Sequence, residues 1–159
     1  MKLKKKILLI VNSTFILDSI FNKLRIDLET RSVIIGQLQN NRNKNTNIKK
    51  ILVETLKLDS GVAQDLVNIL SVSGDIDQVK KKIEKDFKKF NILDEIEYIL
   101  SIFSGEVVQD FNVNFTIKLD LKFTPYEMLC YSGVFFEAFS LNNLNSPICF
   151  GGRLFISIT

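Results

Sequence analysis

The stretch from residue 112 to residue 123 alternates between apolar and polar side chains almost without a break. Its apolar members include Val113, Phe115, Ile117, Leu119 and Leu121. A period of two places these side chains together on one face of an extended chain and leaves the intervening polar residues on the other. The pattern predicts a half-buried β-strand, which needs a second layer to cover its apolar face.

The part of the chain before this strand has a helical period. From Ser13 to about Gly105, apolar residues recur every three to four positions, the spacing of amphipathic helices. Residues that cap helices well stand where three of these helices are expected to begin: Asn12 or Ser13, Asp27, and Asp59 or Ser60.

Polar and glycine residues divide the helical part further. The segment NNRNKNTN at 40–47 predicts a loop, and the apolar residues of 48–56 predict a helix after it. Gly74 interrupts the pattern, and two more amphipathic helices are expected over 75–90 and 91–104.

Three further segments predict strands. Residues 134–139 and 153–158 follow the alternating stretch, with a turn-rich link (NNLNSP) at 142–147 between them. Short links predict that the three strands form an antiparallel meander. The apolar run at 7–11 follows a basic start, but it is too short for a signal peptide or a membrane span, so a buried strand is expected there.

These periods predict an α+β fold in which an amino-terminal helical region is followed by an antiparallel sheet, with the helices covering one face. A chain of 159 residues is the size of one ordinary domain. We expect a single domain over 1–159, mainly helical with a short first strand in 1–105 and mainly strands in 106–159.

The charge pattern does not predict nucleic-acid binding. The net charge is only +3, and the basic residues fall into three separate clusters at 2–6, 42–50 and 80–89. The third cluster alternates with residues such as Ile83 and Phe87, as the solvated side of an amphipathic helix does. A solvated helix face is the expected role.

Few residues of this chain are suited to metal or acid–base chemistry. There is no histidine, and Cys130 and Cys149 are the only cysteines, so the usual zinc ligand sets cannot be assembled. Both cysteines stand in apolar stretches, where we expect reduced, partly buried thiols. No metal, cofactor or catalytic group is predicted.

The carboxy-terminal third carries three short motifs in order. They are Tyr131-Ser132-Gly133, Phe136-Glu137 and Gly151-Gly152-Arg153. This arrangement resembles the class II histidyl-tRNA synthetase core, in which a Tyr-Thr-Gly segment leads into a Phe-Glu strand and then a Gly-Gly-Arg-Tyr-Asp segment. The spacing between the motifs also fits.

The departures from that family concern its catalytic groups. The family's catalytic arginine falls on Tyr126, and its Leu-Asp pair falls on Met128 and Leu129. The Tyr-Asp pair after Gly-Gly-Arg becomes Leu154 and Phe155. The cation that would stabilise a developing phosphate charge is therefore absent, and no synthetase activity is expected.

The same core without synthetase activity is similar to the ATP phosphoribosyltransferase regulatory subunit of histidine biosynthesis. That resemblance is weak from Lys6 to Gly105 and stronger from Asp120 to Arg153. The amino-terminal third of the family has no counterpart in this sequence. It implies a cytoplasmic, non-catalytic protein that senses histidine and associates with the catalytic phosphoribosyltransferase subunit. We expect an oligomer. Without that third, apolar faces of the sheet and helices would be exposed, and self-association or a partner protein would have to bury them.

A histidine-like pocket is the site that the resemblance implies, and it would be formed by Tyr131, Ser132, Gly133, Glu137, Gly151, Gly152 and Arg153. Structural roles are the alternative for several of them. Glu137 could face solvent with Arg153 as its cross-strand partner, and the two glycines could form a turn or bulge. The alternative function is a degenerate synthetase-like fragment that serves as an adaptor or structural module and binds no ligand.

Overall fold

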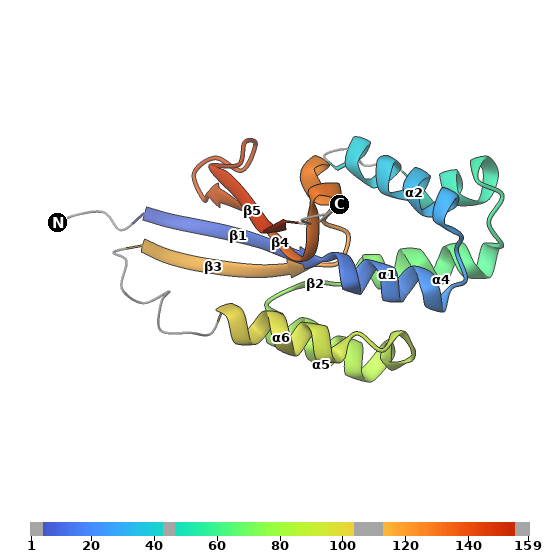
Figure 1. The fold of residues 1–159 in the computed structure, drawn as a ribbon, viewed down its shortest axis with the longest axis horizontal. Coiled ribbons are helices and arrows are strands. Elements are labelled where there is room, and N and C mark those ends of the chain that lie inside the picture. Colours follow the sequence, from blue (N-terminus) through green and yellow to red (C-terminus); the bar gives the residue numbers. More distant parts are fainter. Residues whose placement is uncertain (1–4, 43–46, 104–112, 155–159) are drawn as a thin grey trace, which may run out of the picture.

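The computed structural model describes residues 5–42, 47–103 and 113–154 (Figure 1). Its strands are β1 (Lys5–Ser13), β2 (Ser73–Gly74), β3 (Val113–Asp120), β4 (Tyr131–Ser140) and β5 (Cys149–Leu154). Its α-helices are α1 (Thr14–Lys23), α2 (Leu28–Asn40), α3 (Ile48–Lys50), α4 (Ser60–Leu70), α5 (Ile76–Asp86) and α6 (Leu93–Phe103). Short turns of other helix types are η1 (Ile51–Thr55), η2 (Lys88–Phe90) and η4 (Tyr126–Cys130).

Local sequence signals predicted the helix starts correctly. Ser13 caps α1 by accepting a hydrogen bond from the Phe15 backbone, and Asp27 caps α2 by accepting one from the Thr30 backbone. Asp59 caps α4 in the same way. The expected helix over 48–56 is divided between α3 and the π-helical turn η1, and the helix from Asp75 ends at Asp86 instead of residue 90.

The predicted α+β class is confirmed, but the antiparallel meander is wrong for its first strand: β4 and β5 pair antiparallel as expected, whereas β3 does not neighbour β4. The sheet order is β2-β3-β1-β4-β5, so β1 lies between β3 and β4 and runs parallel to β3. The apolar run of β1 suits a central strand, because such a strand has a neighbour on each side. The last strand is β5, four residues earlier than expected, and residues 155–158 of the prediction lie outside the described residues.

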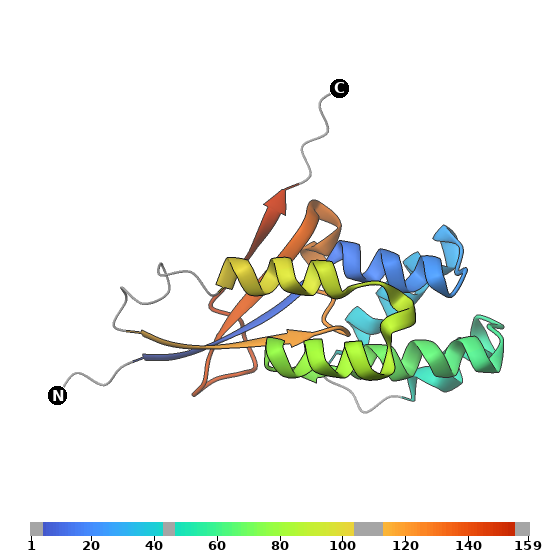
Figure 2. The same ribbon diagram turned by 90° about the horizontal axis from the view of Figure 1, so that it is seen from below.

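Helices cover one face of this sheet. Helices α1 and α5 contact β4 and β3, and α5 and α6 lie in front of the strands when the molecule is seen from below (Figure 2). Val11, Leu119 and Phe136 point to this covered face and join the hydrophobic core. The helices therefore cover this face more fully than the opposite one, which the end of α2 reaches.

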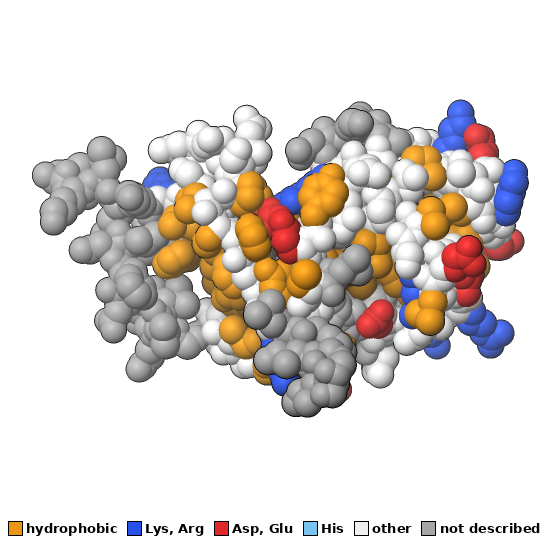
Figure 3. Space-filling view, turned by 45° about the horizontal axis from the view of Figure 1, so that its top comes forward, with side chains coloured by type: hydrophobic (Ala, Val, Ile, Leu, Met, Phe, Trp, Pro, Cys, Tyr) orange, Lys and Arg blue, Asp and Glu red, His pale blue; other side chains and the backbone are white. Residues whose placement is uncertain are grey.

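The opposite face is left partly open, and we call it the open face. The strand register places Ile10 of β1, Glu137 of β4 and Phe150 of β5 side by side on it. Figure 3 shows hydrophobic side chains gathered over the sheet, whereas charged side chains crowd the helical end of the molecule. The open face is where a ligand or partner can reach the sheet.

Candidate functional site

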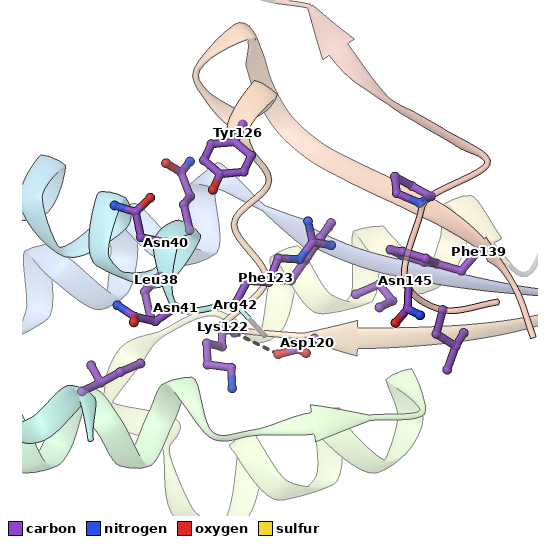
Figure 4. Close-up of a pocket in the computed structure, with 15 residues that line it drawn as sticks. Leu38, Asn40, Asn41, Arg42, Asp120, Lys122, Phe123, Tyr126, Phe139 and Asn145 are labelled. Atoms are coloured by element: carbon purple, nitrogen blue, oxygen red, sulfur yellow. Dashed lines mark hydrogen bonds between the residues drawn. The ribbon is translucent and has the colours of Figure 1, made fainter. Parts of the chain in front are cut away.

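A hollow of about 450 Å³ lies on the open face, between the carboxyl end of α2 and the link from β4 to β5 (Figure 4). We call it the open-face hollow. Its lining combines buried apolar groups with amides and charges: Ile10, Leu38, Gln39, Asn40, Asn41, Arg42, Ile48, Asp120, Lys122, Phe123, Tyr126, Phe139, Leu144, Asn145 and Pro147.

An ion pair lies at the base of the hollow. The Arg42 guanidinium donates to both carboxylate oxygens of Glu137, with 3.0 Å between Nη1 and Oε1 and a shorter bond from Nη2 to Oε2. Glu137 is only 3% exposed, whereas the Arg42 side chain is 29% exposed. Such a two-bond geometry fixes the guanidinium plane as well as its position.

Aromatic rings hold the same guanidinium from the sides. The Arg42 Cζ atom lies 4.9 Å from the centroid of the Phe123 ring and 6.0 Å from that of Phe139. The faces of aromatic rings attract cations, most strongly where water is excluded. Arg42 is thus bound by a carboxylate and two ring faces.

A second pair of charges lines the hollow. Asp120 ends β3, and its Oδ1 accepts a hydrogen bond of 3.1 Å from the Lys122 backbone. Figure 4 shows Asp120 and Lys122 below Arg42, with Asn145 on the other side of the hollow. Arg42, Lys122 and Asp120 line the hollow, and Glu137 balances the Arg42 charge from beneath, so the arrangement suits a small polar or zwitterionic ligand that contacts both signs.

The residues predicted for a histidine-like pocket lie around three different hollows. Tyr131 and Ser132 line one of about 430 Å³ beside α1 and α2. Ser132, Gly133, Gly152 and Arg153 line one of about 260 Å³ against α6, on the covered face. Glu137 lies under the open-face hollow. The structure does not bring these residues together around one cavity.

Glu137 does not have the structural role that the sequence offered as an alternative. It is buried instead of solvent-facing, and the residue opposite it on β5 is Phe150, not Arg153. Its partner Arg42 stands 95 positions earlier in the chain. The sequence did not predict this pairing. Arg42 lies in the polar segment at 40–47, which predicts a loop, and it also belongs to the basic cluster at 42–50.

The two glycines of β5 are required by close packing, not by a turn. A Cβ atom on Gly151 would lie 2.8 Å from the Phe136 ring. A Cβ on Gly152 would lie 2.8 Å from the Tyr131 ring and 2.9 Å from the Val134 carbonyl oxygen. The β4–β5 register shifts between Tyr131 and Phe135, so an irregularity is present in β4 opposite the stretch from Gly152 to Leu154.

Substitution of Gly152 by alanine is expected to destabilise the protein by about 2 kcal/mol, because the backbone oxygen of Val134 cannot move as a flexible side chain can. Gly36 is the matched control. It lies inside α2, and a Cβ atom added to it would have no neighbour within 4 Å, so Gly36→Ala should stabilise by about 0.5–1 kcal/mol. Urea unfolding measures the change in the free energy of unfolding for both variants. A change of the same sign in the two variants would contradict this packing.

The predicted thiols differ from expectation in one respect. Cys130 and Cys149 are free, but both are exposed instead of partly buried.

Among the described residues no group of three or more potential ligands could hold a metal ion. Within the same part of the chain, no helix is long and apolar enough to cross a membrane.

The surroundings of Tyr131 shift the pKa of its phenol. Burial, and then the negative charges of Glu127, Cys130 and Glu137, raise the pKa of Tyr131. The raised pKa keeps this hydroxyl protonated, and able to donate a hydrogen bond, further into the alkaline range than an ordinary tyrosine.

The sequence matches no protein-family model and no curated protein. Solved structures do match the fold. A histidyl-tRNA synthetase from Nostoc sp. PCC 7120 aligns with a TM-score of 0.73 and 18% identity, over 94% of this chain and 36% of the synthetase. An ATP phosphoribosyltransferase regulatory subunit/histidyl-tRNA synthetase from Bacillus halodurans aligns with a TM-score of 0.67 and 20% identity, over 94% and 37%.

A histidine–tRNA ligase subunit from Alicyclobacillus acidocaldarius also aligns, with a TM-score of 0.61 and 16% identity, over 95% of this chain and 47% of that one. The chain therefore has the fold of part of a histidyl-tRNA synthetase-like class II core. It spans less than half the length of each of these structures.

Proposed function

We propose that this chain is a non-catalytic protein similar to the ATP phosphoribosyltransferase regulatory subunit, and that the open-face hollow is its small-molecule site. The single observation that carries the proposal is this hollow, where fixed charges of both signs lie on the open face of a synthetase-like sheet. By the same resemblance, its ligand is histidine and its location is cytoplasmic. Of the residues predicted for a histidine-like pocket, none lines this hollow, and Glu137 is connected to it only through its ion pair with Arg42.

The position of Tyr126 supports a role without catalysis. This residue stands where the synthetase family has its catalytic arginine, and its side chain is 64% exposed at the edge of the hollow. A neutral phenol cannot supply the positive charge that stabilises a phosphoryl transition state. Arg42 is not a substitute, because its charge is already paired with Glu137.

An apolar surface suited to a protein partner lies beside the hollow. We call it the β5 patch, formed by exposed residues of β5 and the link before it: Leu141, Leu144, Ile148 and Phe150. β5 is an edge strand, since it pairs with β4 alone among the described strands. Exposed apolar residues along a strand edge are typical of protein interfaces. We propose the catalytic phosphoribosyltransferase subunit as the partner.

Substitution of Phe150 by aspartate is expected to weaken association with the catalytic subunit at least tenfold, because Phe150 is the large aromatic member of the β5 patch and is 51% exposed. Leu28→Asp is the control: Leu28 is the most exposed apolar side chain of the helical end, and an acid suits the first turn of α2. Sedimentation velocity of each variant, alone and with the catalytic subunit, measures both effects. Unchanged association of Phe150→Asp would contradict this assignment.

The β5 patch also favours a second candidate, an adaptor or structural module without a ligand. Such a protein would associate through the patch whether or not the hollow is intact. Asp120→Asn separates the two functions, since it changes the hollow and leaves the patch in place.

A further inference from the structure

We propose that Glu137 and the rings of Phe123 and Phe139 form a binding site for a guanidinium or a similar small organic cation, and that Arg42 is its resident occupant. A cationic ligand must displace this side chain before it can reach Glu137. This site would regulate access to the open-face hollow. The inference rests on the proposed function only in taking that hollow to be a ligand site.

The carboxylate of Glu137 requires a cation. It is 3% exposed, and a buried carboxylate is costly unless it is paired and hydrogen-bonded. The hydrogen bonds that the described residues give to its two oxygens both come from Arg42. Any group that replaces Arg42 must therefore carry a positive charge and at least one N–H donor.

The rings define the shape of the accepted group. Phe123 is 4.9 Å and Phe139 6.0 Å from the guanidinium carbon, and Phe123 also packs on Phe135, with 5.7 Å between ring centroids. These rings are 0–5% exposed and so are fixed in place. Ring faces beside a fixed two-oxygen acceptor select a planar cation over a compact ammonium group.

Arg42 can leave without disturbing the sheet. It belongs to no strand, since it lies in the turn after α2, and its backbone is held by a long hydrogen bond of 3.4 Å to the Gln39 carbonyl. Its side chain already borders the open-face hollow, into which it can rotate. A tethered occupant acts as a competitor at high local concentration, so free cations should bind the intact protein weakly.

The test uses methylguanidinium chloride at millimolar concentration on the full chain, with sodium chloride at equal ionic strength as the reference. Calorimetry and thermal unfolding are followed for the intact protein, Arg42→Ala and the double variant Arg42→Ala/Glu137→Gln. We expect methylguanidinium to bind Arg42→Ala at least tenfold more tightly than it binds either of the others. Methylammonium should bind Arg42→Ala more weakly than methylguanidinium does.

Equal binding to all three proteins would overturn the inference, as would equal binding to the single and double variants. If Arg42→Ala does not unfold cooperatively by itself, recovery of a cooperative transition with methylguanidinium supports the site. Failure of that recovery, repeated in the bulkier Arg42→Gln, overturns it. Histidine does not enter these experiments, so their failure and failure of the proposed function are separate results.

Discussion

Replacement of Arg42 by methionine should lower the free energy of unfolding by about 3 kcal/mol. This value is at the low end for a broken buried ion pair, because the Arg42 side chain is partly exposed. Methionine keeps the apolar stem of the side chain but removes the positive charge. Glu137, 3% exposed in the intact protein, would then lose its charged partner, whereas in the unfolded chain its carboxylate is hydrated. Urea unfolding followed by circular dichroism measures the loss.

A double-mutant cycle with Glu137→Gln isolates the pair. Glutamine fills the same space without a charge, so Arg42→Met should cost much less in the Glu137→Gln background. Lys50→Met is the control for loss of a cation, because Lys50 and its partner Glu54 are both exposed. A loss below about 1 kcal/mol in Arg42→Met would show that Glu137 does not depend on this partner.

Substitution of Asn12 by leucine should also have a large effect and lower the free energy of unfolding by about 3 kcal/mol. Each buried carbonyl left without a donor costs about 1–3 kcal/mol. Asn12 is fully buried at the end of β1. Its Nδ2 donates to the carbonyl oxygens of Leu121 and Phe123, at 3.2 and 3.1 Å. These bonds hold the segment after β3 that places Phe123 against Arg42.

The matched control is Asn68→Leu. Asn68 is exposed on α4 and accepts one hydrogen bond from Gln64, a neighbour on the same helix. Its replacement should change stability by less than about 0.5 kcal/mol. Thermal and urea unfolding compare the two variants, and similar losses for both would contradict the role given to Asn12.

The sequence predicts those features that depend on neighbours along the chain. The Asp27 and Asp59 caps are confirmed because a cap needs only a side-chain oxygen and a backbone N–H two or three positions later. The alternation in β3 needs only a sheet with one wet face. The strand order was not predictable in this way, because β1 pairs with β3 and β4, which lie about one hundred residues later.

The site follows the same division. The resemblance directed attention to Glu137 on the correct strand, but nothing near it in the sequence indicates Arg42. That arginine stands among Asn and Lys residues in a segment whose composition is typical of a loop. Only the packing of the end of α2 over the sheet brings its guanidinium to the carboxylate. Asn12 was considered only as a helix cap, because its long-range bonds leave no local pattern.

Titration of histidine into the purified protein by isothermal calorimetry is the measurement that tests the central claim most directly. We expect saturable binding at millimolar or lower concentration, weakened at least tenfold in Asp120→Asn because the ligand's ammonium group loses its carboxylate in the hollow. Leu28→Asp should bind as the unchanged protein does, and Tyr131→Ala, on the neighbouring hollow, reports whether the motif predicted from sequence contributes. No binding at millimolar histidine, or equal binding in Asp120→Asn, would contradict the assignment of the open-face hollow.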